Sequence, residues 1–98
     1  MDDDVKTFVS VLQKSHDILR DKFNVKEIGI FGSVARGEHT AASDIDVLVE
    51  FSKPIGLFTF LDLESFLQKQ LSHKIDLVSK KALKPVIKDQ ILKDVVYA

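Results

Sequence analysis

The sequence predicts a small α/β domain, of α+β type, in which one mixed sheet of three or more strands packs against about three to four helices. Apolar residues recur at helical spacing in three segments, and other short segments are β-branched or strictly alternating. The two kinds of segment are interspersed without repeats or low-complexity stretches. A chain of 98 residues buries roughly 60–65% of its unfolded surface, so we expect one domain over residues 1–98.

The N-terminal third predicts a helix followed by a buried strand. Residues 4–22 read as an amphipathic helix, because one face carries Val5, Phe8, Val9, Leu12, His16 and Leu19. Residues 25–31 are short, β-branched and apolar, which predicts a buried strand ending at Gly32. One helical turn over residues 34–37 and a polar loop over 38–43 should follow.

The remaining elements begin with the clearest strand, residues 45–51. Ile45, Val47, Val49 and Phe51 face one way, and the other face carries Asp44, Asp46, Leu48 and Glu50. A turn over residues 52–56 precedes a helix over about 57–72 and a third strand over 74–79. Pro85 suits the first turn of a last helix, whose apolar stripe is Val86, Ile87, Ile91, Leu92, Val95 and Val96.

Two aspartates on the alternating strand are the first indication of chemistry. Asp44 and Asp46 lie two positions apart, so they project from one face with Cα atoms about 7 Å apart. Carboxylates this close repel, and one tends to keep its proton unless a cation intervenes. Mg²⁺ prefers one or two carboxylates plus phosphate oxygens of a substrate. Such a pair alone is usually a solvated face, so its interpretation depends on its neighbours.

The segment before these aspartates predicts a phosphate site. A strand that ends in Gly32-Ser33 and turns into a short helix directs N–H groups outward, and Arg36 stays near that turn. Phosphate binding beside paired carboxylates suits a reaction on a triphosphate. Asp76 lies in an otherwise apolar strand, where burial costs several kcal/mol unless the carboxylate is paired or metal-bound. We expect Asp76 to join the pair and accept a proton; the alternative is a salt-bridged edge aspartate.

The composite motif resembles that of a known family. Gly32-Ser33-Val34-Ala35-Arg36-Gly37 followed by Ser43-Asp44-Ile45-Asp46 resembles the minimal nucleotidyltransferases, the MNT or MntA-like antitoxins of the DNA polymerase β-like nucleotidyltransferase superfamily. The resemblance spans nearly the whole chain and implies a small nucleotidyltransferase fold. It implies nucleotide binding by Gly32, Ser33, Arg36 and Ser43. It also implies that catalysis and binding of one or two Mg²⁺ ions fall to Asp44, Asp46 and Asp76, with ATP as the donor.

The resemblance also implies a partner. Such proteins are commonly encoded beside a HEPN-domain protein and act as its antitoxin, and some transfer AMP from ATP to a tyrosine of the toxin. Many relatives carry Arg where this chain has Val34, so one phosphate contact is missing and Arg36 is expected to compensate. A domain of this size has little surface for gripping an acceptor, so a partner should present it. Two alternatives stay open: occlusion of the partner without catalysis, and transfer to a small molecule or an RNA end.

Composition and net charge exclude or disfavour several other kinds of site and function. Cysteine is absent, which excludes disulfides, thiolate chemistry and Cys-based zinc sites. No apolar run approaches the roughly 18–20 residues of a membrane span, so we expect a cytoplasmic protein without membrane contact. The net charge of −1 gives no reason to expect direct nucleic-acid binding. Lysines concentrate between positions 74 and 93, which indicates a solvated helix face or a docking surface for an acidic partner or phosphates.

The remaining polar and aromatic residues carry less information. His16, His39 and His73 lack ligand spacing, so we expect no metal site there. Phe58, Phe60 and Phe66 are expected in the core rather than in a base-stacking platform, and Tyr97 is expected to pack. Exposed apolar residues and lysines of the last helix are our expected contact for a partner or a second copy, in a homo- or hetero-oligomer.

Overall fold

The computed structural model describes residues 2–38 and 44–98 and confirms the mixed α/β class. Its elements, in chain order, are α1 (Asp2–Lys14), α2 (His16–Phe23), β1 (Val25–Phe31), α3 (Gly32–Ala35), β2 (Ile45–Phe51), α4 (Leu57–Leu71), β3 (Ile75–Ser79), the 3₁₀ helix η1 (Lys80–Ala82), α5 (Pro85–Asp94) and β4 (Val96–Tyr97). The three predicted strands are therefore confirmed, and a short fourth strand follows the last helix.

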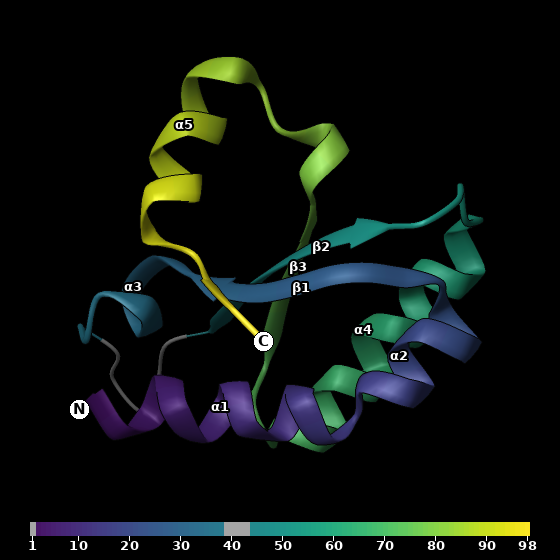
Figure 1. Ribbon diagram of the computed structural model, residues 1–98, viewed down its shortest axis with the longest axis horizontal. Coiled ribbons are helices and arrows are strands. Elements are labelled where there is room, and N and C mark those ends of the chain that lie inside the picture. The colour runs from purple at the N-terminus through teal and green to yellow at the C-terminus, as the bar shows by residue number, and fades with distance from the viewer. Residues whose placement is uncertain (1, 39–43) are drawn as a thin grey trace.

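One sheet of four strands, in the order β3-β2-β1-β4, organises the molecule (Figure 1). β1 runs antiparallel to both β2 and β4, whereas β2 and β3 are parallel. Parallel neighbours need a long crossover connection, and α4 supplies it. Because β2 and β3 run the same way, residues at the start of both strands meet at one end of the sheet.

The core lies between the sheet and the helices α1, α2 and α4, which cover one of its faces (Figure 1). Ile45, Val47 and Val49 of β2 are fully buried there, against Leu63 and Leu67 of α4. The alternation predicted for residues 45–51 is thus confirmed. The carboxylate-bearing face of β2 points away from these helices. α5 lies beyond that other face and has no buried residue.

The predicted single helix over residues 4–22 is wrong, because the chain bends at Ser15. α1 and α2 meet there, and the Ser15 N–H donates to the carbonyls of both Val11 and Leu12 at 3.1 Å. Ser15 is buried and His16 is exposed, so the inward row is Phe8, Leu12, Ser15, Leu19 and Phe23. This row also has helical spacing, but its central member, Ser15, is polar. A search for apolar residues therefore predicts His16, the next residue, for the inward face.

Two further predictions about apolar residues are wrong. Phe60 and Phe66 pack against the core, but Phe58 is 82% exposed at the start of α4. The last helix ends at Asp94, and Val96 belongs to β4 rather than to a helical stripe. Gly29 permits this ending, because a Cβ there would lie 2.8 Å from the Val95 side chain and 2.9 Å from the Val96 carbonyl. Tyr97 is 40% exposed.

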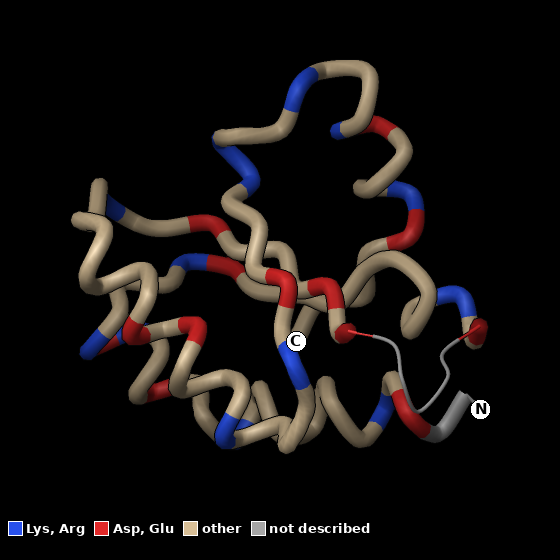
Figure 2. Tube along the Cα trace, turned by 180° about the vertical axis from the view of Figure 1, so that it is seen from behind, with Lys and Arg blue, Asp and Glu red and all other residues tan. Residues whose placement is uncertain are grey.

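Charge is distributed unevenly over the surface (Figure 2). Basic residues mark the segment from the end of β3 into α5, where Lys80, Lys81, Lys84 and Lys88 lie. Acidic residues of β2 and β3 lie near the centre of the same view. Of the helices in residues 2–38 and 44–98, none is long and apolar enough to cross a membrane.

Candidate active site

Two of the predicted catalytic carboxylates occupy paired positions. Asp46 of β2 is the register partner of Asp76 of β3, so both side chains project from the same face of the sheet. The Ile45 N–H donates to the Lys74 carbonyl at 2.9 Å and aligns the starts of the two strands. Asp44 directly precedes β2 and is exposed. The structure therefore brings Asp46 and Asp76 together, with Asp44 at the same end of β2.

The electrostatics of this pair are those of a site with excess negative charge. Partial burial raises the pKa of Asp46 above its ordinary value, and the negative charge of Asp76 raises it further. A hydrogen bond with Asp76 and the charge of Asp44 act on the pKa of Asp46 in the same direction, whereas Arg36 lowers it. Asp76 itself is exposed, so the expectation of a carboxylate in an apolar setting was wrong. The excess negative charge here comes from the proximity of the carboxylates to one another, not from burial of Asp76.

Gly32 lies directly against the Asp46 carboxylate. Phe31, the last residue of β1, pairs with Asp46, and Gly32 follows it with a φ of +74°. A Cβ built on Gly32 would overlap Oδ2 of Asp46. Position 32 therefore requires glycine for two reasons, the left-handed backbone conformation and the close contact with the Asp46 carboxylate. The contact places the predicted phosphate turn beside the acidic pair.

The turn itself is the single helical turn α3. The Arg36 N–H donates to the Gly32 carbonyl at 3.1 Å, and the Glu38 N–H donates to the Ser33 carbonyl at 2.8 Å. Ser33 is half-buried at the start of this turn. Val34 is 1% exposed and belongs to the core cluster, so its side chain points into the protein interior. Ser43 and His39, which were also singled out, lie outside the described residues.

Arg36 is held in place by two carboxylates. Its Nε donates to Glu38 at 2.9 Å and its Nη1 donates to Asp94, at the end of α5, at 3.2 Å. These hydrogen bonds raise the pKa of Arg36, that to Glu38 most, so the guanidinium stays charged. A guanidinium has five N–H donors, so others remain for a phosphate. Asp94 was not predicted, because nothing near it in the sequence indicates a contact with the turn.

The acidic pair fits a magnesium ion that is completed by its substrate. Within the described ranges, no three His, Cys, Asp or Glu side chains surround a common point closely enough to hold a metal by themselves. Mg²⁺ usually keeps several waters and takes one or two carboxylates plus phosphate oxygens, which Asp46 and Asp76 can satisfy. The His73 ring packs on Phe8 at 5.2 Å between centroids.

Known proteins are similar to this chain in sequence and in fold. Residues 12–98 match the nucleotidyltransferase domain family. The chain is 43% identical over 88 residues to protein adenylyltransferase MntA of Thermococcus cleftensis, covering 90% of this chain and 89% of that one. It is 48% identical over 88 residues to a candidate protein adenylyltransferase of Methanocaldococcus jannaschii, covering 89% and 90%.

Solved structures give the same result. A candidate minimal nucleotidyltransferase superposes with a TM-score of 0.74 at 30% identity, covering 93% of this chain and 88% of that one. A chain of a toxin–antitoxin complex with AMP-PNP superposes with a TM-score of 0.72 at 26% identity, covering 87% and 69%. The Gly32 turn, the Asp46–Asp76 pair and these likenesses agree, and the chain belongs to the nucleotidyltransferase domain family as a minimal nucleotidyltransferase.

Proposed function

We propose that this nucleotidyltransferase moves AMP from ATP, with Mg²⁺, onto a tyrosine hydroxyl of a HEPN-domain toxin and thereby acts as its antitoxin. The observation that carries the proposal is the Asp46–Asp76 pair packed against the Gly32 turn. A relative is named protein adenylyltransferase MntA, and a similar chain comes from a toxin–antitoxin complex with AMP-PNP. Both names support AMP transfer and an antitoxin role.

The strand order suggests how the two substrates approach. Asp46 on β2 lies between β1, which leads into the Gly32 turn, and β3, which carries Asp76. In this proposal Gly32, Ser33 and Arg36 bind the triphosphate from the β1 side, and Ser43 also contributes to nucleotide binding. The acceptor hydroxyl arrives from the β3 side, where Asp76 is exposed. Donor and acceptor therefore meet above Asp46 from opposite sides, as an in-line displacement requires.

The bond changes follow from this placement. The acceptor oxygen attacks the α-phosphorus of ATP, the bond from that phosphorus to the bridging oxygen of the β-phosphate breaks, and pyrophosphate leaves. The hydroxyl proton passes to the carboxylate of Asp76. Asp44, Asp46 and Asp76 would hold Mg²⁺, which supplies positive charge to the phosphate oxygens. Arg36 adds a second positive charge beside them, and its pairs with Glu38 and Asp94 orient it.

The test uses ATP labelled at the α-phosphate, Mg²⁺ and the HEPN-domain protein that the proposal expects to be encoded by an adjacent gene. Wild type should label the partner, and Asp46→Asn or Asp44→Asn should label it at least about a hundredfold more slowly. Asp62→Asn, an exposed aspartate of α4, is the matched control and should label normally. Absence of labelling by wild type, or equal labelling by Asp44→Asn, rejects the proposal.

A toxicity assay in cells separates catalysis from occlusion. Wild type should relieve growth inhibition by the partner, and a folded Asp46→Asn variant should not. Full relief by that variant would favour an antitoxin that acts by occlusion alone. Label found on a small metabolite or an RNA end, instead of on the protein, would favour the other alternative acceptors.

A further inference from the structure

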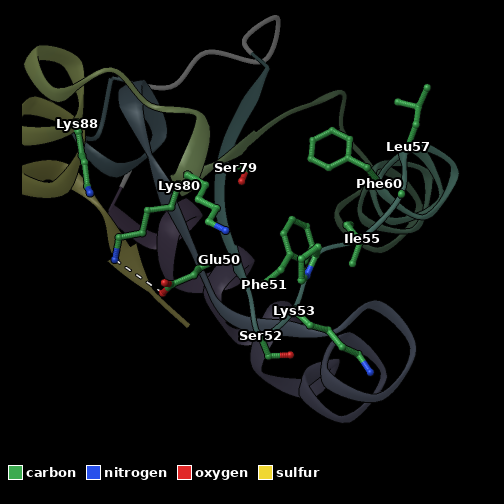
Figure 3. Close-up of a pocket in the computed structure, with 13 residues that line it drawn as sticks. Glu50, Phe51, Ser52, Lys53, Ile55, Leu57, Phe60, Ser79, Lys80 and Lys88 are labelled. Atoms are coloured by element: carbon green, nitrogen blue, oxygen red, sulfur yellow. Dashed lines mark ion pairs between the residues drawn. The ribbon is translucent and has the colours of Figure 1, made fainter.

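A second site lies at the end of β2 opposite the carboxylates. A cavity of about 580 Å³ is formed by the ends of β2 and β3, the turn before α4, η1 and α5 (Figure 3). Its lining begins at Glu50, four residues along β2 from Asp46, which at strand spacing is roughly 13 Å. The volume is within the range of ligand-binding pockets. The catalytic groups described above do not line it.

The charge of this cavity is strongly asymmetric. Lys53, Lys80, Lys81 and Lys88 line it from three different segments, and Glu50 is the one acidic residue among the lining residues. Glu50 pairs with Lys80 at 3.9 Å, a long contact between partly exposed side chains. Within residues 2–38 and 44–98, the other three lysines form no ion pair. The cavity therefore presents uncompensated positive charge, which favours an acidic ligand.

Apolar side chains line the same cavity and continue beyond it. Phe51 and Phe60 line it with their ring centroids 6.4 Å apart, and Leu57 adds an aliphatic side chain that is 68% exposed. On the adjoining turn of α4, Phe58 is 82% and Leu61 44% exposed. Exposed apolar groups beside a cavity are typical of protein–protein contacts. A small anion inside the cavity would leave Phe58 in water, whereas a polypeptide can cover it.

We propose that this cavity, with Leu57, Phe58 and Leu61 beside it, docks an acidic segment that bears apolar side chains on the protein carrying the acceptor hydroxyl. The acidic groups lie against Lys53, Lys80, Lys81 and Lys88. The apolar groups cover the exposed start of α4. The identity of that protein rests on the proposed function; the docking chemistry rests on the cavity. Docking at the far end of β2 leaves the Asp76 side of the sheet open to the hydroxyl.

The test compares two double charge reversals. Lys53→Glu with Lys81→Glu alters two exposed lysines of the cavity, and Lys14→Glu with Lys69→Glu makes the same net charge change on exposed positions of α1 and α4. Both are made in an Asp46→Asn background, so that no transfer disturbs the equilibrium. By calorimetry at low salt, the cavity variant should bind the HEPN-domain partner about tenfold more weakly than the control. Added salt should weaken binding by the control more steeply than binding by the cavity variant.

Activity in the wild-type background gives an independent readout. The cavity variant should show a raised KM for the protein acceptor, with kcat and the affinity for ATP unchanged. Equal partner affinity of the two variants overturns the inference, as does a loss of ATP binding in the cavity variant alone, which would make the cavity a nucleotide site. If wild type binds the partner through these lysines but transfers nothing, the proposed reaction fails and the docking site stands. No partner binding by wild type ends the docking inference.

Discussion

The Arg36 guanidinium and the Asp94 carboxylate meet at 3.2 Å, although 58 positions separate them in the sequence. This pair joins the turn after β1 to the C-terminal end of α5, a helix that has no buried residue. Arg36 is 46% and Asp94 22% exposed, so the pair lies at the boundary between solvent and protein. The position of Arg36 at the proposed phosphate turn therefore depends partly on a helix that buries none of its residues.

Asp94→Asn should disturb nucleotide binding more than folding. Loss of the charge should cost at most about 1 kcal/mol of unfolding free energy, because exposed pairs contribute little. Among residues 2–38 and 44–98, Glu38 is then the one charged partner left to Arg36, and the KM for ATP should rise several-fold with kcat nearly unchanged. Steady-state kinetics and thermal unfolding check this, with Asp89→Asn, exposed on the same helix, as the control. An unchanged KM for ATP would show that α5 does not position Arg36.

Asp46→Asn should stabilise the metal-free protein at neutral pH. The pKa of Asp46 is raised in the folded protein. At neutral pH the Asp46 carboxyl group therefore ionises more readily in the unfolded chain, and this difference favours unfolding. The stability that this carboxyl group contributes is fully present below its ordinary pKa. That contribution is lost as the pH rises through the raised pKa of the folded state. The variant should therefore have a higher Tm than wild type at pH 7.

The pH dependence is the critical part of that experiment. The difference in Tm between Asp46→Asn and wild type should shrink as the pH falls and vanish below about pH 4, where the unfolded carboxyl is also protonated. Asp62→Asn, which removes an exposed carboxylate of α4, is the control for the loss of one negative charge. A difference that is constant from pH 4 to pH 7 would contradict the electrostatic origin of the effect.

Gly32→Ala should damage both the fold and the site. The positive φ disfavours alanine by about 1–2 kcal/mol, and the new methyl group must displace the Asp46 carboxylate. Nucleotidyl transfer should fall further than the loss of stability explains. Gly56→Ala is the matched control, because φ there is −80° and a Cβ would meet nothing within 4 Å; its stability should change by no more than about 1 kcal/mol. Equal activity of the two variants would contradict the contact.

Val34→Ala tests whether this position has any part in phosphate binding. Its side chain is buried in the core, so removing two methyl groups should cost about 2 kcal/mol of unfolding free energy. The KM for ATP should remain at the wild-type value below the melting transition. Urea denaturation and kinetics at low temperature check the two parts. A raised KM in a fully folded variant would assign a nucleotide contact to this turn position.

Local patterns predicted the positions of Asp46 and of the Gly32 turn better than they predicted the surrounding contacts. The alternation around Asp46 and the Gly32-Ser33 turn are properties of a few consecutive residues, so periodicity and backbone requirements are enough to place them. Asp94 reaches Arg36 only because α5 returns over the open face of the sheet, and no local pattern encodes that return.

The errors in the core have similar causes. Hydrophobicity alone placed Phe58 inside, but the buried stripe of α4 is Leu63, Leu67 and Leu71, and Phe58 is off that stripe. The bend at Ser15 left the helical repeat intact, so periodicity could not reveal it. Where a polar residue belongs to the inward row, a pattern of apolar residues selects a neighbour instead.

The parallel pairing of β2 and β3 also determines when, during folding, the candidate active site is assembled. Asp46 and Asp76 become neighbours only when α4 has crossed over and β3 has joined the sheet. During synthesis, a nascent chain that ends before β3 carries the Gly32 turn and Asp46 but has half of the acidic pair. Competence for nucleotidyl transfer should therefore arise late, in a single step, when the edge strand docks.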